Sequence, residues 1–155
     1  MLVLTGISDA HQIKTKTLTI MHPWIHAAES GASGTQGYVV IRNTGAEADR
    51  LIGASLDGAA DAMVMQPVPG SAGGECRPAN GIEIAPGATL ELKPGQGELK
   101  FGKLTKSQMR DIYSDGVLRF AKAGAIKVEF FVDAPKATSS ADVIVADCAK
   151  AAVTQ

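Results

Sequence analysis

The segment 81–104, GIEIAPGATLELKPGQGELKFGKL, constrains the fold more than any other part of the sequence. Two Pro-Gly pairs interrupt it, and each pair favours a β-turn, because proline fixes φ for the first central position and glycine tolerates a positive φ at the second. On either side of these turns apolar and polar residues alternate with a period of two, which is the pattern of a half-buried strand. The segment therefore predicts three short strands joined by tight turns.

The same alternation recurs along most of the chain. Further strands are expected at 15–21, 35–43, 50–56, 60–68, 116–124 and 125–135. Pro23 disfavours a central strand position just after the first of these, and the polar stretch 105–115 predicts a connection. A chain of 155 residues suits one domain with one core. We predict an all-β, single-domain protein, a β-sandwich or small barrel of Greek-key type.

Charge and motifs exclude several classes of function. The chain carries 15 basic and 16 acidic side chains without a basic stripe, which argues against nucleic-acid binding. No apolar run approaches the length of a transmembrane helix, so we expect no membrane insertion. Nucleophile–histidine–acid orderings, a His-Glu-x-x-His motif and a phosphate-binding glycine loop are all missing from the sequence. We therefore expect a protein that is not an enzyme.

The segment 63–76, MVMQPVPGSAGGEC, contains a candidate metal site. Met63 and Met65 are at strand spacing, and Cys76 follows a glycine-rich loop; thioether and thiolate sulfur atoms are soft ligands that select Cu(I). The alternative is that the methionines pack in a core and that the cysteine is inert. Cys76 and Cys148 could form one disulfide in an oxidising compartment, but their distance in sequence favours two free thiols.

The three histidines form a second candidate set. The segment 1–10, MLVLTGISDA, is mostly apolar and ends in small residues, as the remnant of a signal peptide would. Cleavage after it would leave His11 as the first residue, and a terminal amine with its own imidazole chelates Cu(II). His22 and His26 could assist, or could be surface and loop residues.

Four segments together resemble the periplasmic copper chaperone family PCu(A)C: KTLTIMHPWIHAA, GYVVIRNTGAEADRLIGAS, GIEIAPGATLELKPG and GVLRFAKAGAIKVEFFV. The resemblance covers roughly 15–132. It implies a cupredoxin-like β-barrel at 11–134, followed by a C-terminal tail at 135–155. It also implies export to the periplasm, which supports the interpretation of 1–10 as a signal-peptide remnant.

The resemblance also implies where a copper site would lie. In the family, the ligands are a His, a Met across a loop, and a later His-x-Met pair. These positions fall on Met65, Cys76, Glu98 and Lys100 of this sequence, so the spacing is kept while none of the four ligand types is. Glu98 is a hard ligand and the ammonium group of Lys100 cannot ligate a metal; on a solvated strand face the two could pair instead.

Two hypotheses follow. In the first, the protein binds copper, Cu(I) rather than Cu(II), through an altered ligand set. That set is either Met63, Met65 and Cys76 or His11, His22 and His26. The resemblance then implies delivery to a partner, a cytochrome oxidase assembly protein or another copper acceptor. In the second hypothesis the protein binds no metal. It is then a binding module for a protein or another ligand, and the vacated ligand face is the contact surface.

Overall fold

The computed structural model describes residues 12–70 and 75–133, and within them the protein is all-β. Eleven strands and no helix occur in this part of the chain, which therefore has no helix long and apolar enough to cross a membrane. The strands are β1 (Gln12–Lys14), β2 (Leu18–His26), β3 (Gly34–Asn43), β4 (Asp49–Leu56), β5 (Ala59–Pro67), β6 (Cys76–Pro78), β7 (Ile82–Ile84), β8 (Thr89–Leu92), β9 (Glu98–Leu104), β10 (Tyr113–Phe120) and β11 (Gly124–Asp133).

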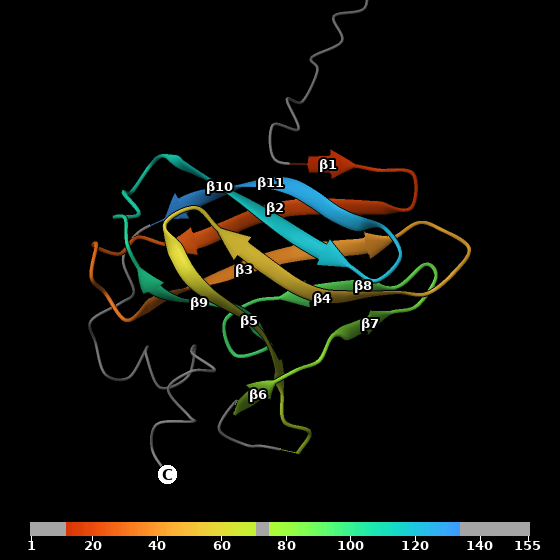
Figure 1. Cartoon of the computed structure of the whole chain (residues 1–155). Coiled ribbons are helices and arrows are strands. Elements are labelled where there is room, and N and C mark those ends of the chain that lie inside the picture. Colours follow the sequence, from red (N-terminus) through yellow and green to blue (C-terminus); the bar gives the residue numbers. More distant parts are fainter. Residues whose placement is uncertain (1–11, 71–74, 134–155) are drawn as a thin grey trace, which may run out of the picture.

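The strands form one sheet that curls into a barrel (Figure 1). Its order is β6-β5-β9-β3-β2-β11-β10-β4-β7, with β1 added to β2 and β8 added to β3. All pairs are antiparallel except β11 with β2. Strands β4 and β5 lie near opposite ends of this order, yet only residues 57–58 separate them in the chain. The two ends of the sheet must therefore come together, as in a barrel. The predicted all-β fold is confirmed.

Apolar side chains from most of the strands fill the interior. The rings of Phe101 on β9 and Phe130 on β11 meet edge to face with centroids 5.6 Å apart, although β9 and β11 are not neighbours in the sheet. Gly116 makes room for this packing, because a Cβ atom there would lie 2.6 Å from the Phe130 ring. The core is thus a layer of side chains between opposite walls of the barrel.

Strand β2 corrects one expectation. It continues through Pro23 and lies between β3 and β11, a central position that proline was expected to prevent. The pairing of β2 with β3 shifts register between Met21 and Trp24, and His22 has a φ of 49°. Two residues thus sit in a bulge where no ladder hydrogen bond is required from Pro23, and the strand resumes beyond it.

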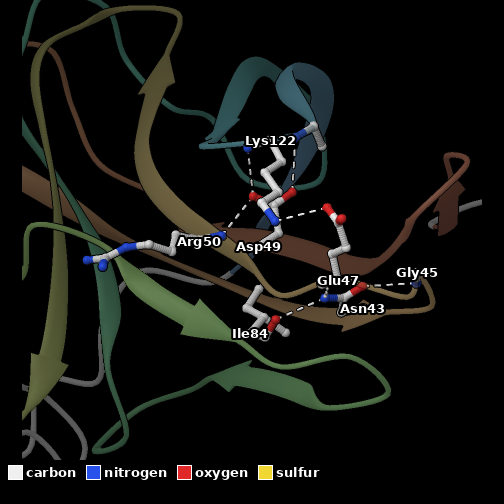
Figure 2. A network of polar contacts seen from close by, with 8 residues as sticks. Asn43, Gly45, Glu47, Asp49, Arg50, Ile84 and Lys122 are labelled. Carbon is white, nitrogen blue, oxygen red and sulfur yellow. Dashed lines mark hydrogen bonds and ion pairs between the residues drawn. The ribbon is translucent and has the colours of Figure 1, made fainter.

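The turn between β3 and β4 is fixed by Asn43, which is buried (Figure 2). Its Nδ2 donates to the backbone oxygens of Glu47 at 2.7 Å and Ile84 at 2.9 Å, and its Oδ1 accepts from the backbone N–H of Gly45 at 2.9 Å. One side chain thereby closes the turn and joins it to β7. Asparagine is suited to this position because it both donates and accepts.

Asp49, at the start of β4, anchors a second turn (Figure 2). Its carboxylate accepts hydrogen bonds from the backbone N–H groups of Arg50 at 2.8 Å, Lys122 at 2.8 Å and Ala123 at 3.0 Å. The last two belong to the turn between β10 and β11. The predicted hairpin around residues 123–124 is present, and Asp49 ties it to β4.

Candidate functional site

Met65 and Cys76 lie together, as their place in the sequence predicted. They pack against each other in a small buried cluster that is separate from the main core. Strand β6 pairs antiparallel with the end of β5, with Pro78 opposite Met65 and Cys76 opposite Pro67. The exposed fractions are 4% for Met65 and 6% for Cys76. The glycine-containing loop therefore returns Cys76 to the strand that carries Met65.

Glu98 completes this cluster from β9. It lies directly opposite Met65, and side chains directly opposite on antiparallel strands project from the same face. Glu98 has an exposed fraction of 0%. The expectation of a solvated face was therefore wrong at this position, whereas Lys100, two residues along the strand, is exposed. The outer face of β9 is thus buried at Glu98 and exposed at Lys100.

Tyr38 on β3 is the buried neighbour of Glu98. Gly37 pairs with Leu99, so the register brings Tyr38 alongside Glu98. Burial raises the pKa of Tyr38, and the negative charge of Glu98 and a hydrogen bond to it raise this pKa further. The phenol is therefore held protonated, as a donor towards the carboxylate.

Aromatic rings extend the same row of side chains to β2. Trp24 is directly opposite Tyr38, with ring centroids 4.6 Å apart, and His26 meets Trp24 at 5.1 Å and Tyr38 at 5.8 Å. A continuous outer-face row therefore runs from His26 and Trp24 through Tyr38 and Glu98 to Met65. Sequence reasoning missed Tyr38, since strand alternation places it on the side away from the core. Only its register with Glu98 reveals the pairing.

Met63 lies apart from the buried cluster. It is opposite Lys100 on β9, and 47% of its surface is exposed. Met63 and Met65 share a strand face, as predicted, but only Met65 is enclosed.

Cys76 is disulfide-bonded, so the expectation of a free thiol was wrong. The other cysteine of the sequence, Cys148, lies outside the described residues. No local sequence pattern predicts a disulfide between cysteines that are distant in the sequence. A sulfur in a disulfide carries no thiolate charge, so Cys76 is a strong copper ligand only after reduction.

The histidines are not gathered into one site in the described part of the chain. His22 is exposed in the bulge, whereas His26 is half-buried against Trp24 and Tyr38. The bulge at His22 and Pro23 separates His22 from the row in which His26 packs against Trp24 and Tyr38. His11 lies outside the described residues, as do the predicted signal-peptide remnant at 1–10 and the tail at 135–155.

The donor atoms at the candidate positions differ in how well they suit copper. Among residues 12–70 and 75–133, no group of three or more His, Cys, Asp or Glu side chains is placed to hold a metal ion. The sulfur atoms of Met65 and Cys76 are the soft donors that lie together, and Lys100 offers no acceptor. Of the four positions Met65, Cys76, Glu98 and Lys100, the two sulfur atoms provide the donors that suit copper, once Cys76 is reduced.

Comparison with known proteins places the chain in a family. Residues 18–132 match the family model LpqE-like, described as "Putative lipoprotein LpqE-like". No curated protein sequence matches the chain.

Solved structures share the fold. The copper-bound PCuAC domain from PmoF2 is 23% identical, with a TM-score of 0.69, and the match covers 81% of this chain and 99% of that domain. The apo PCuAC domain from PmoF1 is 23% identical, with a TM-score of 0.71 and coverages of 81% and 100%. The solution structure of CuI-DR1885 from Deinococcus radiodurans is 16% identical, with a TM-score of 0.52 and coverages of 81% and 83%. The chain therefore belongs to the LpqE-like family and has the fold of PCuAC domains.

Proposed function

We propose that this protein is an exported, copper-chaperone-like protein that binds Cu(I) through an altered, sulfur-containing ligand set and passes it to an acceptor. The observation that carries the proposal is the packing of Met65 against Cys76 at two positions where the PCu(A)C resemblance places ligands. A domain of the same fold from PmoF2 is copper-bound. The cargo is therefore proposed to occupy the family's place in the fold with different donors.

The chemistry of the two sulfur atoms favours Cu(I). A thioether and a thiolate are both soft donors, and the thiolate adds the charge that a monovalent ion requires. Uptake requires reduction of the Cys76 disulfide, in which a dithiol reductant supplies two electrons and two protons and becomes a disulfide itself. Copper then displaces the proton of the Cys76 thiol.

Glu98 is assigned the role of a buried counter-charge in this site. It lies opposite Met65 and is fully buried, so its carboxylate acts on a nearby cation through a medium of low effective dielectric. Tyr38 lies beside this carboxylate on β3, and the charge of Glu98 contributes to the raised pKa of its phenol. Lys100 is exposed and is given no part in binding.

The disulfide also bears on compartment and partner. Disulfides persist in oxidising compartments such as the periplasm, which supports an exported protein. A copper acceptor there, such as a cytochrome oxidase assembly protein, is the proposed partner. A site whose cysteine alternates between thiolate and disulfide would release copper on oxidation.

Competition for Cu(I) against a chromogenic chelator tests the proposal. The reduced protein is expected to withdraw one equivalent of copper, and Met65→Ala and Cys76→Ser are expected to abolish this. Met109→Ala is the matched control, because Met109 is 64% exposed and lies in the loop before β10. Failure of the reduced protein to compete, or binding unchanged in both site variants, overturns the proposal.

A further variant keeps the test valid if Cys76→Ser does not fold. Cys148→Ser removes the other cysteine of the chain and leaves Cys76 without an intramolecular disulfide partner. This variant is expected to bind Cu(I) without added reductant. Absence of copper binding by folded Cys148→Ser contradicts a role for the Cys76 thiolate.

The second candidate function is a metal-free binding module, and one observation favours it. Cys76 is bonded and Glu98 interacts with Tyr38, so two of the four family ligand positions are engaged within the protein. Of the vacated ligand face, only Lys100 is exposed, with Met63 opposite it. Retention of a native partner by the Met65→Ala variant, together with no copper binding by the wild type, is the outcome that selects this function.

A further inference from the structure

A groove of about 690 Å³ lies far from the Met65–Cys76 cluster in the order of the sheet. Its walls come from β1, the bulge of β2, the end of β4, β10 and β11, and no residue of β5, β6 or β9 contributes to it. Its volume is in the range of a ligand-binding site. The groove therefore shares no residue with the proposed copper site.

The floor and one side of the groove are apolar. The apolar lining residues are Ile13, Pro23, Leu56, Val117 and Val128. Tyr113 forms one wall with 45% of its surface exposed, and its ring is held edge to face against Phe131 at 5.5 Å. Ile112 precedes it and is also 45% exposed. Exposed apolar side chains thus occur both in the wall of the groove and in the chain that enters β10.

Three carboxylates also belong to the lining, and two of them lie directly opposite each other. Asp115 on β10 is directly opposite Glu129 on β11, and the backbone N–H of Asp57 donates to the Asp115 backbone oxygen at 2.8 Å. Like charges directly opposite on paired strands destabilise a sheet. Among the described residues neither Asp115 nor Glu129 belongs to an ion pair, whereas Asp57 is paired with Lys106 at 2.8 Å.

Lys127 also lines the groove, so the charge of the lining is mixed but remains negative. The lining contains the carboxylates of Asp57, Asp115 and Glu129 and the ammonium group of Lys127, so its net charge is −2. When Lys106, the ion-pair partner of Asp57, is included, the net charge is −1. A cation placed between Asp115 and Glu129 would relieve their repulsion. No three His, Cys, Asp or Glu residues of the described ranges are arranged to hold a metal, which directs the inference towards an organic cation.

We propose that this groove binds a segment of a partner protein that presents a lysine or arginine side chain next to a large apolar side chain. The basic group lies between Asp115 and Glu129, and the apolar side chain covers the floor and the Tyr113 ring. A protein segment fits better than a compact cation, because neighbouring residues of one chain present the basic group and the apolar side chain together.

Short peptides and amide chemical shifts of the ¹⁵N-labelled protein test this. The probe is the hexapeptide GLRIKG. The matched peptides are GLEIEG, which reverses the side-chain charge, and GSRSKG, which lacks the large apolar side chains. Only GLRIKG is expected to shift the amides of Gly116, Val117 and Val128, which line the groove. Its affinity is expected to fall between about 20 and about 300 mM NaCl, as exposed charges are screened.

Neutral, isosteric variants locate the interaction. The double variant Asp115→Asn/Glu129→Gln is expected to bind GLRIKG about tenfold more weakly, because the charged partners are lost. Glu83→Gln is the control, since Glu83 is an exposed acid on β7 outside the groove. Equal binding of GLEIEG, shifts confined to other strands, unchanged affinity in the double variant, or equal affinity for free arginine would each overturn the proposal.

Discussion

The Asn43–Asp49 network and the Met65–Cys76–Glu98 cluster are both buried and both lie within residues 18–132, which match the family model, but they differ in what their residues serve. In the network, the polar atoms of Asn43 and Asp49 bond to backbone groups of other turns and strands. In the cluster, Met65, Cys76 and Glu98 are the positions at which we propose that other residue types replace the ligands of the family. Residues that complete backbone hydrogen bonds are constrained by the fold, whereas the ligand positions have, on our proposal, changed without loss of the barrel.

The largest effect is expected for Asp49→Ala. This substitution leaves three backbone N–H groups without their acceptor, and hydrogen bonds to a charged group are the strong ones. The free energy of unfolding is expected to fall by about 4 kcal/mol, measured by urea denaturation. Asp61→Ala, which removes an exposed carboxylate paired with Lys103, is the matched control and should change it little. A similar small loss in both variants would remove the contrast between the two regions.

Truncation of the two methionines sharpens the contrast inside the cluster. Met65→Ala is expected to lower the free energy of unfolding by about 3 kcal/mol, because a buried side chain leaves a cavity. Met63→Ala is expected to change it by less than about 0.5 kcal/mol, since Met63 is half exposed. Equal losses in the two variants, by the same denaturation measurement, would mean that Met65 is not enclosed as described.

Glu98→Gln tests whether the buried carboxylate serves stability or function. Glutamine keeps the shape and still accepts a hydrogen bond, but it avoids burying a charge. We expect the free energy of unfolding at pH 7 to rise by about 1 kcal/mol while Cu(I) affinity falls. Glu91→Gln on β8, an exposed acid, is the control for both measurements. A clear loss of stability in Glu98→Gln would place Glu98 with the structural network instead.

The smallest effect is expected in the pH dependence. The pKa of Tyr38 is raised in the folded state, so its contribution to stability is complete below the ordinary tyrosine value of about 10 and is lost as the pH rises above it. Stability measured between about pH 9 and pH 11 should therefore fall more steeply in the wild type than in Tyr38→Phe. Tyr113→Phe, at an exposed tyrosine, should keep the wild-type slope. Identical slopes in Tyr38→Phe and the wild type would contradict the burial of a protonated phenol.

Sequence predicted the parts of the fold that local chemistry determines. The two Pro-Gly turns are present with positive φ at Gly87 and Gly95, and they separate β7, β8 and β9 as expected. The polar connection was predicted to end at residue 115, which was wrong, since β10 begins at Tyr113. The continuation of β2 past Pro23 also escaped prediction, because a bulge depends on the register with the neighbouring strand.

For the candidate site, the sequence predicted which side chains lie together better than it predicted their burial and bonding. The proximity of Met65 and Cys76 follows from strand return across a loop, and it is present. The disulfide of Cys76 and the burial of Glu98 depend on contacts between segments distant in sequence, for which alternation carries no signal. Tyr38 was missed for the same reason, since its partner lies on another strand.

X-ray absorption at the copper edge tests the central claim most directly, namely that the place of the family site is kept with different donors. Reduced protein loaded with one equivalent of Cu(I) is expected to show a shell of sulfur scatterers that is diminished in Met65→Ala and unchanged in Met109→Ala. A shell of nitrogen scatterers that survives Met65→Ala and disappears in His26→Ala would contradict the claim and assign copper to the histidines.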